Sequence, residues 1–119
     1  QLPPLVVSKL VVTTPMGGSG MSAGYMVLTN NSDQTVTIDR FSSPQFAKVD
    51  LHETQIENEI ARMRPLKSIS IEAGSSVVFE KGGKHLMLMG AKGGIEQVTL
   101  NIYEGDTLLL SVNTRPGRN

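Results

Sequence analysis

The stretch QVTLNIYEGDTLLLSV, residues 97–112, indicates the fold class most directly. Two runs rich in β-branched and large apolar residues, 97–103 and 107–112, flank the triplet Glu104-Gly105-Asp106. Runs of this length and composition are typical of short strands, and a glycine between polar residues is typical of a tight turn. This part of the chain therefore predicts two strands joined by a turn.

The same pattern extends through the rest of the chain. Turn-forming residues separate eight further runs of strand composition, which are 5–14, 24–30, 35–39, 48–54, 60–65, 68–71, 76–79 and 86–89. No stretch has a helical period with capping residues. About eight to ten short strands, with turns roughly every 8–12 residues, predict an all-β sandwich or barrel.

The composition limits the classes of function. A chain of 119 residues without a linker or an internal repeat predicts one domain covering 1–119. The 11 Lys and Arg balance 11 Asp and Glu, and there is no basic run, so we expect neither nucleic acid nor an anionic membrane as partner. We expect no membrane-spanning segment, because no apolar run approaches the ~20 residues that cross a bilayer.

The compartment stays open at this point. The chain has no cysteine, which excludes disulfides, zinc knuckles, thiolate nucleophiles and iron–sulfur sites, but cytosolic and exported proteins can both lack cysteine. The first residues, Gln1-Leu2-Pro3-Pro4, contain neither the charged nor the apolar region of a signal peptide. The chain is therefore interpreted as either a mature exported protein or a cytosolic one.

One histidine–methionine pair lies in the run His85-Leu86-Met87-Leu88-Met89, which alternates strictly. Successive side chains of a strand point to opposite faces, so Leu86 and Leu88 share one face and the other three residues share the second. The leucines are the natural core residues. We therefore expect His85 and Met87 to project together, away from the core.

A second pair is expected across a hairpin formed by the runs 48–54 and 60–65. His52 lies on the face opposite Leu51, which belongs to the core face. A turn centred between residues 57 and 58 would place His52 directly across from Met63, with Cβ atoms about 4.5–5.5 Å apart. An imidazole and a thioether at that spacing can meet one ion between them.

Two imidazoles and two thioethers favour a particular ion. Thioether is a soft ligand that selects Cu(I), and imidazole suits copper as well as zinc. Zinc sites use Cys, His and carboxylate, and a blue-copper electron-transfer centre requires a cysteine thiolate. A single Met or His in a β-protein is more often a core or surface residue, so the copper interpretation depends on the two pairs together.

The spacing of the four residues, His52-x10-Met63-x21-His85-x-Met87, resembles the H-x10-M-x21-H-x-M signature of the periplasmic copper chaperones of the PCuAC type. The surrounding segments are similar to that family as well, at 24–30 (GYMVLTN), 51–54 (LHET), 63–65 (MRP) and 82–90 (GGKHLMLMG). The resemblance extends from residue 5 to residue 112, which is nearly the whole chain.

This resemblance implies a cupredoxin-like Greek-key β-sandwich that acts in the periplasm after its signal peptide is removed. It implies Cu(I) as the bound metal, with His52, Met63, His85 and Met87 as the ligands. It also implies delivery of copper to an acceptor protein, which would be the CuA-containing subunit of cytochrome c oxidase or another copper carrier. We expect the chain to be a monomer.

Some features depart from the family pattern or stay outside it. Asn58-Glu59 replaces the glycine that is usual near the hairpin turn, so the turn geometry need not follow that of the family. The residues 113–119 do not form the His- and Met-rich tail of some relatives, so we expect one Cu(I) per chain. Met89 follows the alternation and is expected at a hydrophobic rim rather than as a spare ligand. Met16 and Met21, in a glycine-rich loop, are expected to be ordinary loop residues.

Other functions remain open beside copper delivery. A periplasmic storage or resistance protein would need the same four ligands, whereas a metal-free β-sandwich binding module would need none of them. We expect no enzyme, because the sequence has no nucleophile–base pair and no obvious pair of catalytic carboxylates. The stretch Gly17-Gly18-Ser19-Gly20 also lacks the Lys and the strand–helix context of a phosphate-binding loop.

Overall fold

The computed structural model describes residues 5–13, 20–92 and 96–117, and these residues form eleven strands and no helix. The strands are β1 (Leu5–Val12), β2 (Ser22–Asn30), β3 (Val36–Ile38), β4 (Arg40–Ser42), β5 (Phe46–Glu57), β6 (Ile60–Pro65), β7 (Ile69–Ile71), β8 (Ser76–Phe79), β9 (Lys84–Ala91), β10 (Val98–Glu104) and β11 (Thr107–Thr114). Over the described ranges, no helix with the length and apolar character of a membrane span is found.

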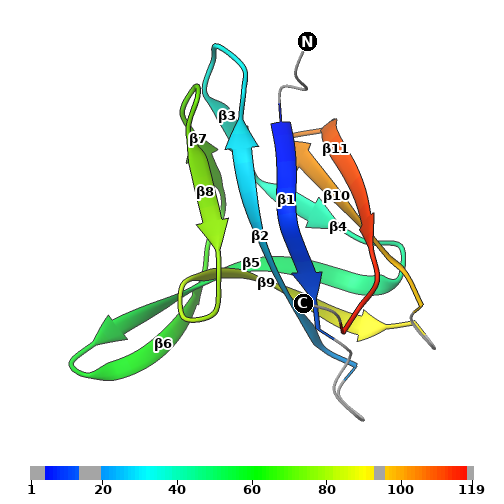
Figure 1. Ribbon diagram of the computed structural model, residues 1–119. Coiled ribbons are helices and arrows are strands. Elements are labelled where there is room, and N and C mark those ends of the chain that lie inside the picture. The colour runs from blue at the N-terminus through cyan, green and yellow to red at the C-terminus, as the bar shows by residue number, and fades with distance from the viewer. Residues whose placement is uncertain (1–4, 14–19, 93–95, 118–119) are drawn as a thin grey trace.

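The strands form two layers. The larger layer is a six-stranded sheet in the order β1-β2-β8-β9-β5-β6, in which β2 also pairs with β9. The other layer contains the three-stranded sheet β11-β10-β4 and the two-stranded ribbon β3-β7. Figure 1 shows β5 and β9 side by side, running across the lower part of β1 and β2, so the large sheet is strongly twisted.

Apolar side chains from both layers fill the space between them. Phe41 of β4 meets Phe79 of β8 edge to face, with ring centroids 6.1 Å apart. The side chains that are almost completely buried come from both layers and include Met26, Leu28, Ile38, Ile71, Leu86, Leu88, Val98, Leu100 and Ile102. This arrangement confirms the prediction of an all-β sandwich.

One core strand has no counterpart in the sequence prediction. Residues 40–42 belong to none of the predicted runs, yet Arg40–Ser42 forms β4 and pairs with β10. A strand of three residues with one buried side chain, Phe41, is too short to show a period of two.

The β5–β6 hairpin extends beyond the sandwich, as Figure 1 shows. Residues 46–53 of β5 pair with β9, whereas residues 54–57 pair with β6 alone. Every residue of β6 is exposed. The hairpin is therefore an arm whose base belongs to the central sheet and whose tip lies in solvent.

Candidate metal centre

Strand pairing brings the two histidines together. β5 and β9 are antiparallel neighbours in a register that places Leu51 opposite Leu86 and His52 opposite His85. Leu86 is fully buried on the core face, so the two histidines share the opposite face. Their rings meet edge to face, with centroids 6.0 Å apart. The sequence placed each histidine beside a methionine but did not show that the two histidines are cross-strand partners.

The predicted register of the hairpin is wrong by two residues. His52 lies opposite Pro65, and Met63 lies opposite Thr54. The reason is the turn, in which Asn58 and Glu59 both have positive φ, 53° and 68°. Two such residues make the two-residue turn that matches strand twist, and they move the centre of the hairpin by one position. A shift of two partners preserves the face, so Met63 still lies on the same side as His52 and is its diagonal neighbour.

Three of the four predicted ligands line a pocket of about 340 Å³. Its lining contains Met63, His85 and Met87, together with Tyr25, Thr54, Lys81 and Gly82. His52 is not in this lining but lies directly beside His85 on the neighbouring strand. The pocket is thus built from β2, β5, β6, β9 and the turn before β9.

The hydrogen bonds of His85 determine which of its nitrogens is available. Its Nδ1 lies 3.0 Å from the carbonyl oxygen of Gly83. A carbonyl can only accept, so Nδ1 carries the proton and donates it, and Nε2 of the neutral ring holds a free lone pair. That Nε2 is buried and has no hydrogen-bond partner among the described residues. A backbone carbonyl that orients the second nitrogen of a histidine is the usual arrangement around a metal ligand.

His85 is more deeply placed than the sequence predicted. We expected it to project away from the core, but only 5% of the residue is exposed. It does lie on the face opposite the core leucines, and the residues around the pocket cover it there. A buried ring with one unpaired nitrogen costs free energy, on the order of 1–3 kcal/mol, that a bound ion would recover.

His52 has a comparable arrangement. Its Nε2 lies 3.9 Å from Oδ2 of Asp50, two residues away on the same face of β5. Its Nδ1 is buried and lacks a hydrogen-bond partner in the described ranges. Those ranges contain three such orphaned side-chain atoms, and two of them are these histidine nitrogens; the third is Oγ of Ser22.

The donor set fits a soft ion. Across residues 5–13, 20–92 and 96–117, no group of three or more His, Cys, Asp and Glu side chains could hold a metal. A site for a hard ion or for zinc would require such a group. The thioethers of Met63 and Met87 and the imidazole of His85 line one pocket, with His52 beside it, and these donors instead match the preferences of Cu(I).

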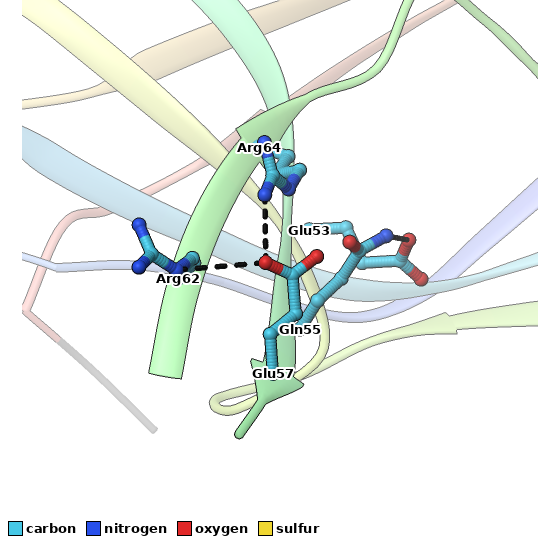
Figure 2. A network of polar contacts seen from close by, with 5 residues as sticks. All are labelled: Glu53, Gln55, Glu57, Arg62 and Arg64. Carbon is cyan, nitrogen blue, oxygen red and sulfur yellow. Dashed lines mark hydrogen bonds and ion pairs between the residues drawn. The ribbon is translucent and has the colours of Figure 1, made fainter. Parts of the chain in front are cut away.

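The reverse face of the hairpin is held by charged and amide side chains, which Figure 2 shows. Oε1 of Glu57 accepts a 2.7 Å hydrogen bond from Arg64 and lies 3.5 Å from Nε of Arg62. Nearer the base, Glu53 accepts hydrogen bonds from Gln55 and from Lys84. These contacts join β5 to β6 and to β9 on the side away from the pocket.

These contacts also change two pKa values. Hydrogen bonds from Gln55 and then from Lys84 hold the pKa of Glu53 below its ordinary value. The hydrogen bond to Glu57 raises the pKa of Arg64 above its ordinary value. Both charged states that make the contacts are therefore favoured in the folded chain.

The remaining methionines lie apart from the pocket or outside the described ranges. Met89 is half-buried, lies opposite Lys48 and does not line the pocket. Met21 is half-buried beside the start of β2. Met16 and the stretch Gly17-Gly18-Ser19 lie outside the described residues.

The sequence prediction missed the other walls of the pocket. Tyr25 and Lys81 line it from β2 and from the turn before β9, and the carbonyl of Gly83 orients His85. A glycine pair two residues before a histidine was the available signal for the turn, whereas nothing in the sequence alone could place Tyr25 there.

A family model described as "Putative lipoprotein LpqE-like" matches residues 5–113. The chain belongs to the LpqE-like family. A curated relative is "Putative lipoprotein Lxx21020" of Leifsonia xyli subsp. xyli, which is 35% identical over 101 residues. The match covers 80% of this chain and 61% of the relative, so this LpqE-like chain spans about three-fifths of that protein.

Solved structures show that this LpqE-like chain has the fold of PCuAC domains. The solution structure of apo-DR1885 from Deinococcus radiodurans has a TM-score of 0.69 and 27% identity, and the match covers 100% of this chain and 82% of that one. The apo PCuAC domain from PmoF1 has a TM-score of 0.69 at 15% identity, with coverages of 100% and 96%. The copper-bound PCuAC domain from PmoF2 has a TM-score of 0.69 at 17% identity, with coverages of 98% and 93%.

Proposed function

We propose that this chain binds one Cu(I) through His52, Met63, His85 and Met87 and hands it to an acceptor protein outside the cytoplasm. The observation that carries the proposal is the buried, unpartnered Nε2 of His85 in a pocket that it shares with two thioethers. His52 adds a second buried, unpartnered nitrogen beside it. Copper is the cargo of this site and not a resident cofactor.

The comparisons support the proposal at two points. One of the structures with this fold is a copper-bound PCuAC domain, so the fold is compatible with copper binding. The lipoprotein description of the family supports a location in the cell envelope, as expected for the periplasm. The acceptor that we propose is the CuA-containing subunit of cytochrome c oxidase or another copper carrier.

The chemistry of the ligands suits transfer better than catalysis. Thioethers and neutral imidazoles bind Cu(I) without supplying a nucleophile or a general base for a reaction. Thioethers do not have to lose a proton to bind, so each can be released and rebound without proton exchange. A protein that must give up its metal benefits from such ligands.

The first test is an anaerobic titration of the apo protein with Cu(I) against a chromophoric chelator, with X-ray absorption on the loaded sample. We expect one tight equivalent with mixed sulfur and nitrogen scattering. His85→Ala and Met87→Ala should each weaken binding by at least about tenfold, which is about 1.4 kcal/mol. Met89→Ala is the matched control, because Met89 shares the strand and the face but does not line the pocket.

The proposal fails if the apo protein does not compete with the chelator, or if the absorption spectrum contains nitrogen and oxygen neighbours alone. Equal losses in Met87→Ala and Met89→Ala would also contradict the ligand assignment. Transfer from the loaded protein to a copper-free acceptor then separates delivery from storage, because a storage protein would retain its copper.

A further inference from the structure

The four proposed ligands differ widely in exposure. His85 is 5% exposed, and the side chain of His52 is 23% exposed. Met87 is half-buried on the central strand β9. Met63 is 62% exposed and lies on β6, the edge strand of the hairpin arm. Three ligands therefore stand on two central strands, and the fourth stands on an exposed one.

The hairpin arm has two different faces. Thr54 and Met63 are cross-strand partners, as are Ile56 and Ala61, and all four lie on the face of the pocket. The reverse face carries the ion pairs of Glu57 and the exposed side chain of Ile60. Ile56, at the tip, is 71% exposed. An exposed apolar surface thus continues from Met63 outward along the arm.

The pocket is also larger than a single ion needs, and a lysine side chain belongs to its lining. Its volume of about 340 Å³ leaves space for a side chain beside a single copper ion. Lys81 lines it and forms no ion pair within the described part of the chain. Since all four proposed ligands are neutral, bound Cu(I) would keep its positive charge, and both charges favour an incoming anion.

We propose that copper leaves over the hairpin arm, with Met63 as the first ligand to be replaced and the apolar face of the arm seated against an acceptor that presents a cysteine thiolate. The proposal rests on the copper-binding function proposed above and adds the exit side, the order of ligand exchange and the chemical class of the acceptor. The name exit face is used below for Ile56, Ala61 and Met63.

The exchange is balanced without a redox partner. The bond between copper and the sulfur of Met63 breaks as a bond between copper and the acceptor's sulfur forms. Copper remains Cu(I) throughout, and the proton of the acceptor's thiol passes to solvent before attack. The thiolate is soft, as the thioether is, and in addition neutralises the charge of the metal, which drives transfer toward the acceptor.

The exposure of the ligands determines the order of exchange. An incoming sulfur can reach copper from the side of Met63 without displacing core strands. Attack from the side of His85 is hindered, because only 5% of that residue is exposed and His52 lies directly beside it on the neighbouring strand. The arm can move or be covered at smaller cost, since its outer strand β6 has no further neighbour among the described strands.

The test compares two tip isoleucines on opposite faces of the same arm. Ile56→Glu introduces a charge on the exit face, and Ile60→Glu, at a residue 54% exposed, introduces the same charge on the reverse face. Copper transfer is followed by stopped flow from the loaded chain to a copper-free soluble CuA domain with reduced cysteines, and separately to a small chelator.

We expect Ile56→Glu to slow transfer to the CuA domain by about tenfold or more, as expected for a charge introduced into an apolar contact. Its affinity for Cu(I) and its transfer to the small chelator should match those of the wild type. Ile60→Glu should match the wild type in every measurement. Equal rates for the two variants would overturn the proposal, whether both are slowed or neither is.

The ligand order has its own measurement. Met63→Ala should keep one Cu(I), bound more weakly than in the wild type but more tightly than in His85→Ala. Loss of all copper from Met63→Ala would overturn the assignment of Met63 as the outermost ligand. A wild-type chain that binds no Cu(I) would instead contradict the proposed function, so a failure of the ligand order and a failure of copper binding are distinguishable.

Discussion

At the scale of single residues, a backbone carbonyl gives His85 its chemical role. The carbonyl oxygen of Gly83 accepts a hydrogen bond from Nδ1–H, and the opposite nitrogen is buried without a hydrogen-bond partner among the described residues. In a surface histidine with the same motif spacing, both ring nitrogens would form hydrogen bonds with water. Residue identity therefore explains less of the site than the hydrogen bond to Gly83 and the burial of the ring.

Glu53 allows a prediction of pH dependence on the other face of β5. Its pKa is lowered in the folded state, chiefly by the hydrogen bond from Gln55 and then by that from Lys84. The carboxylate therefore stabilises the fold fully above its unfolded pKa, and this stabilisation is lost as pH falls through the lower folded value. For the wild-type apo protein we expect the free energy of unfolding, measured in urea, to fall as the pH decreases below 4.5, which is the ordinary pKa of a glutamate side chain.

The Glu53→Gln variant should flatten that part of the pH profile, because the side chain no longer titrates. Glu59→Gln, in the hairpin turn, is the control and should retain the wild-type slope. An unchanged slope in Glu53→Gln would show that other carboxylates account for the acid sensitivity.

At the scale of elements, the close approach of β5 and β9 positions the histidine pair. Gly90 of β9 has a φ of 72°, and a Cβ added there would lie 2.7 Å from the Cβ of Ala47 on β5. Real Cβ contacts of that length do not occur, and the side chain of alanine cannot move aside. Glycine at this position lets the two strands stay in the register that places His52 opposite His85.

We predict that Gly90→Ala destabilises the protein by about 2–3 kcal/mol, because it combines an unfavourable φ with a clash between strands. Gly74→Ala is the matched control, since φ is 76° there and no atom of the described residues lies within 4 Å of the added Cβ. It should cost about 1 kcal/mol. Urea unfolding of both variants gives the comparison, and equal losses would show that the contact with Ala47 is relieved at no cost.

At the scale of the whole molecule, the proposed ligands connect three neighbouring strands at one side of the large sheet. His52 belongs to β5, Met63 to β6, and His85 and Met87 to β9. Along the chain, the strands β7 and β8 lie between Met63 and His85. An unfolded chain holds the four donors apart, so a metal that needs all of them binds the folded state preferentially.

Copper loading should therefore raise the melting temperature. Binding that is restricted to the native state adds about 4.1 kcal/mol of stability when free Cu(I) is 1,000 times the dissociation constant. We expect the midpoint, measured anaerobically by circular dichroism, to rise with free Cu(I) in the wild type and to rise less in His85→Ala at the same free Cu(I) concentration. A midpoint that Cu(I) left unchanged, or raised equally in the wild type and in His85→Ala, would contradict a site formed by these ligands in the folded chain.

The local features of the chain could be predicted from the sequence. Alternation of apolar residues and the positions of turn-forming residues predicted ten of the strands, the core face of Leu86 and Leu88, and the shared face of His85 and Met87. These properties depend on neighbours within a few residues, which the sequence contains directly.

Tertiary structure alone decided how the local pieces meet. The pairing of β5 with β9 places His52 opposite His85, and it depends on packing between residues far apart in sequence, such as Leu51 and Leu86. Met63 pairs with Thr54 rather than with His52, because the hairpin turns at Asn58 and Glu59, which have positive φ, one position later than predicted. The sequence by itself thus determined which side chains could serve as ligands and on which face each lies, whereas long-range packing decided which of them touch and which one remains exposed.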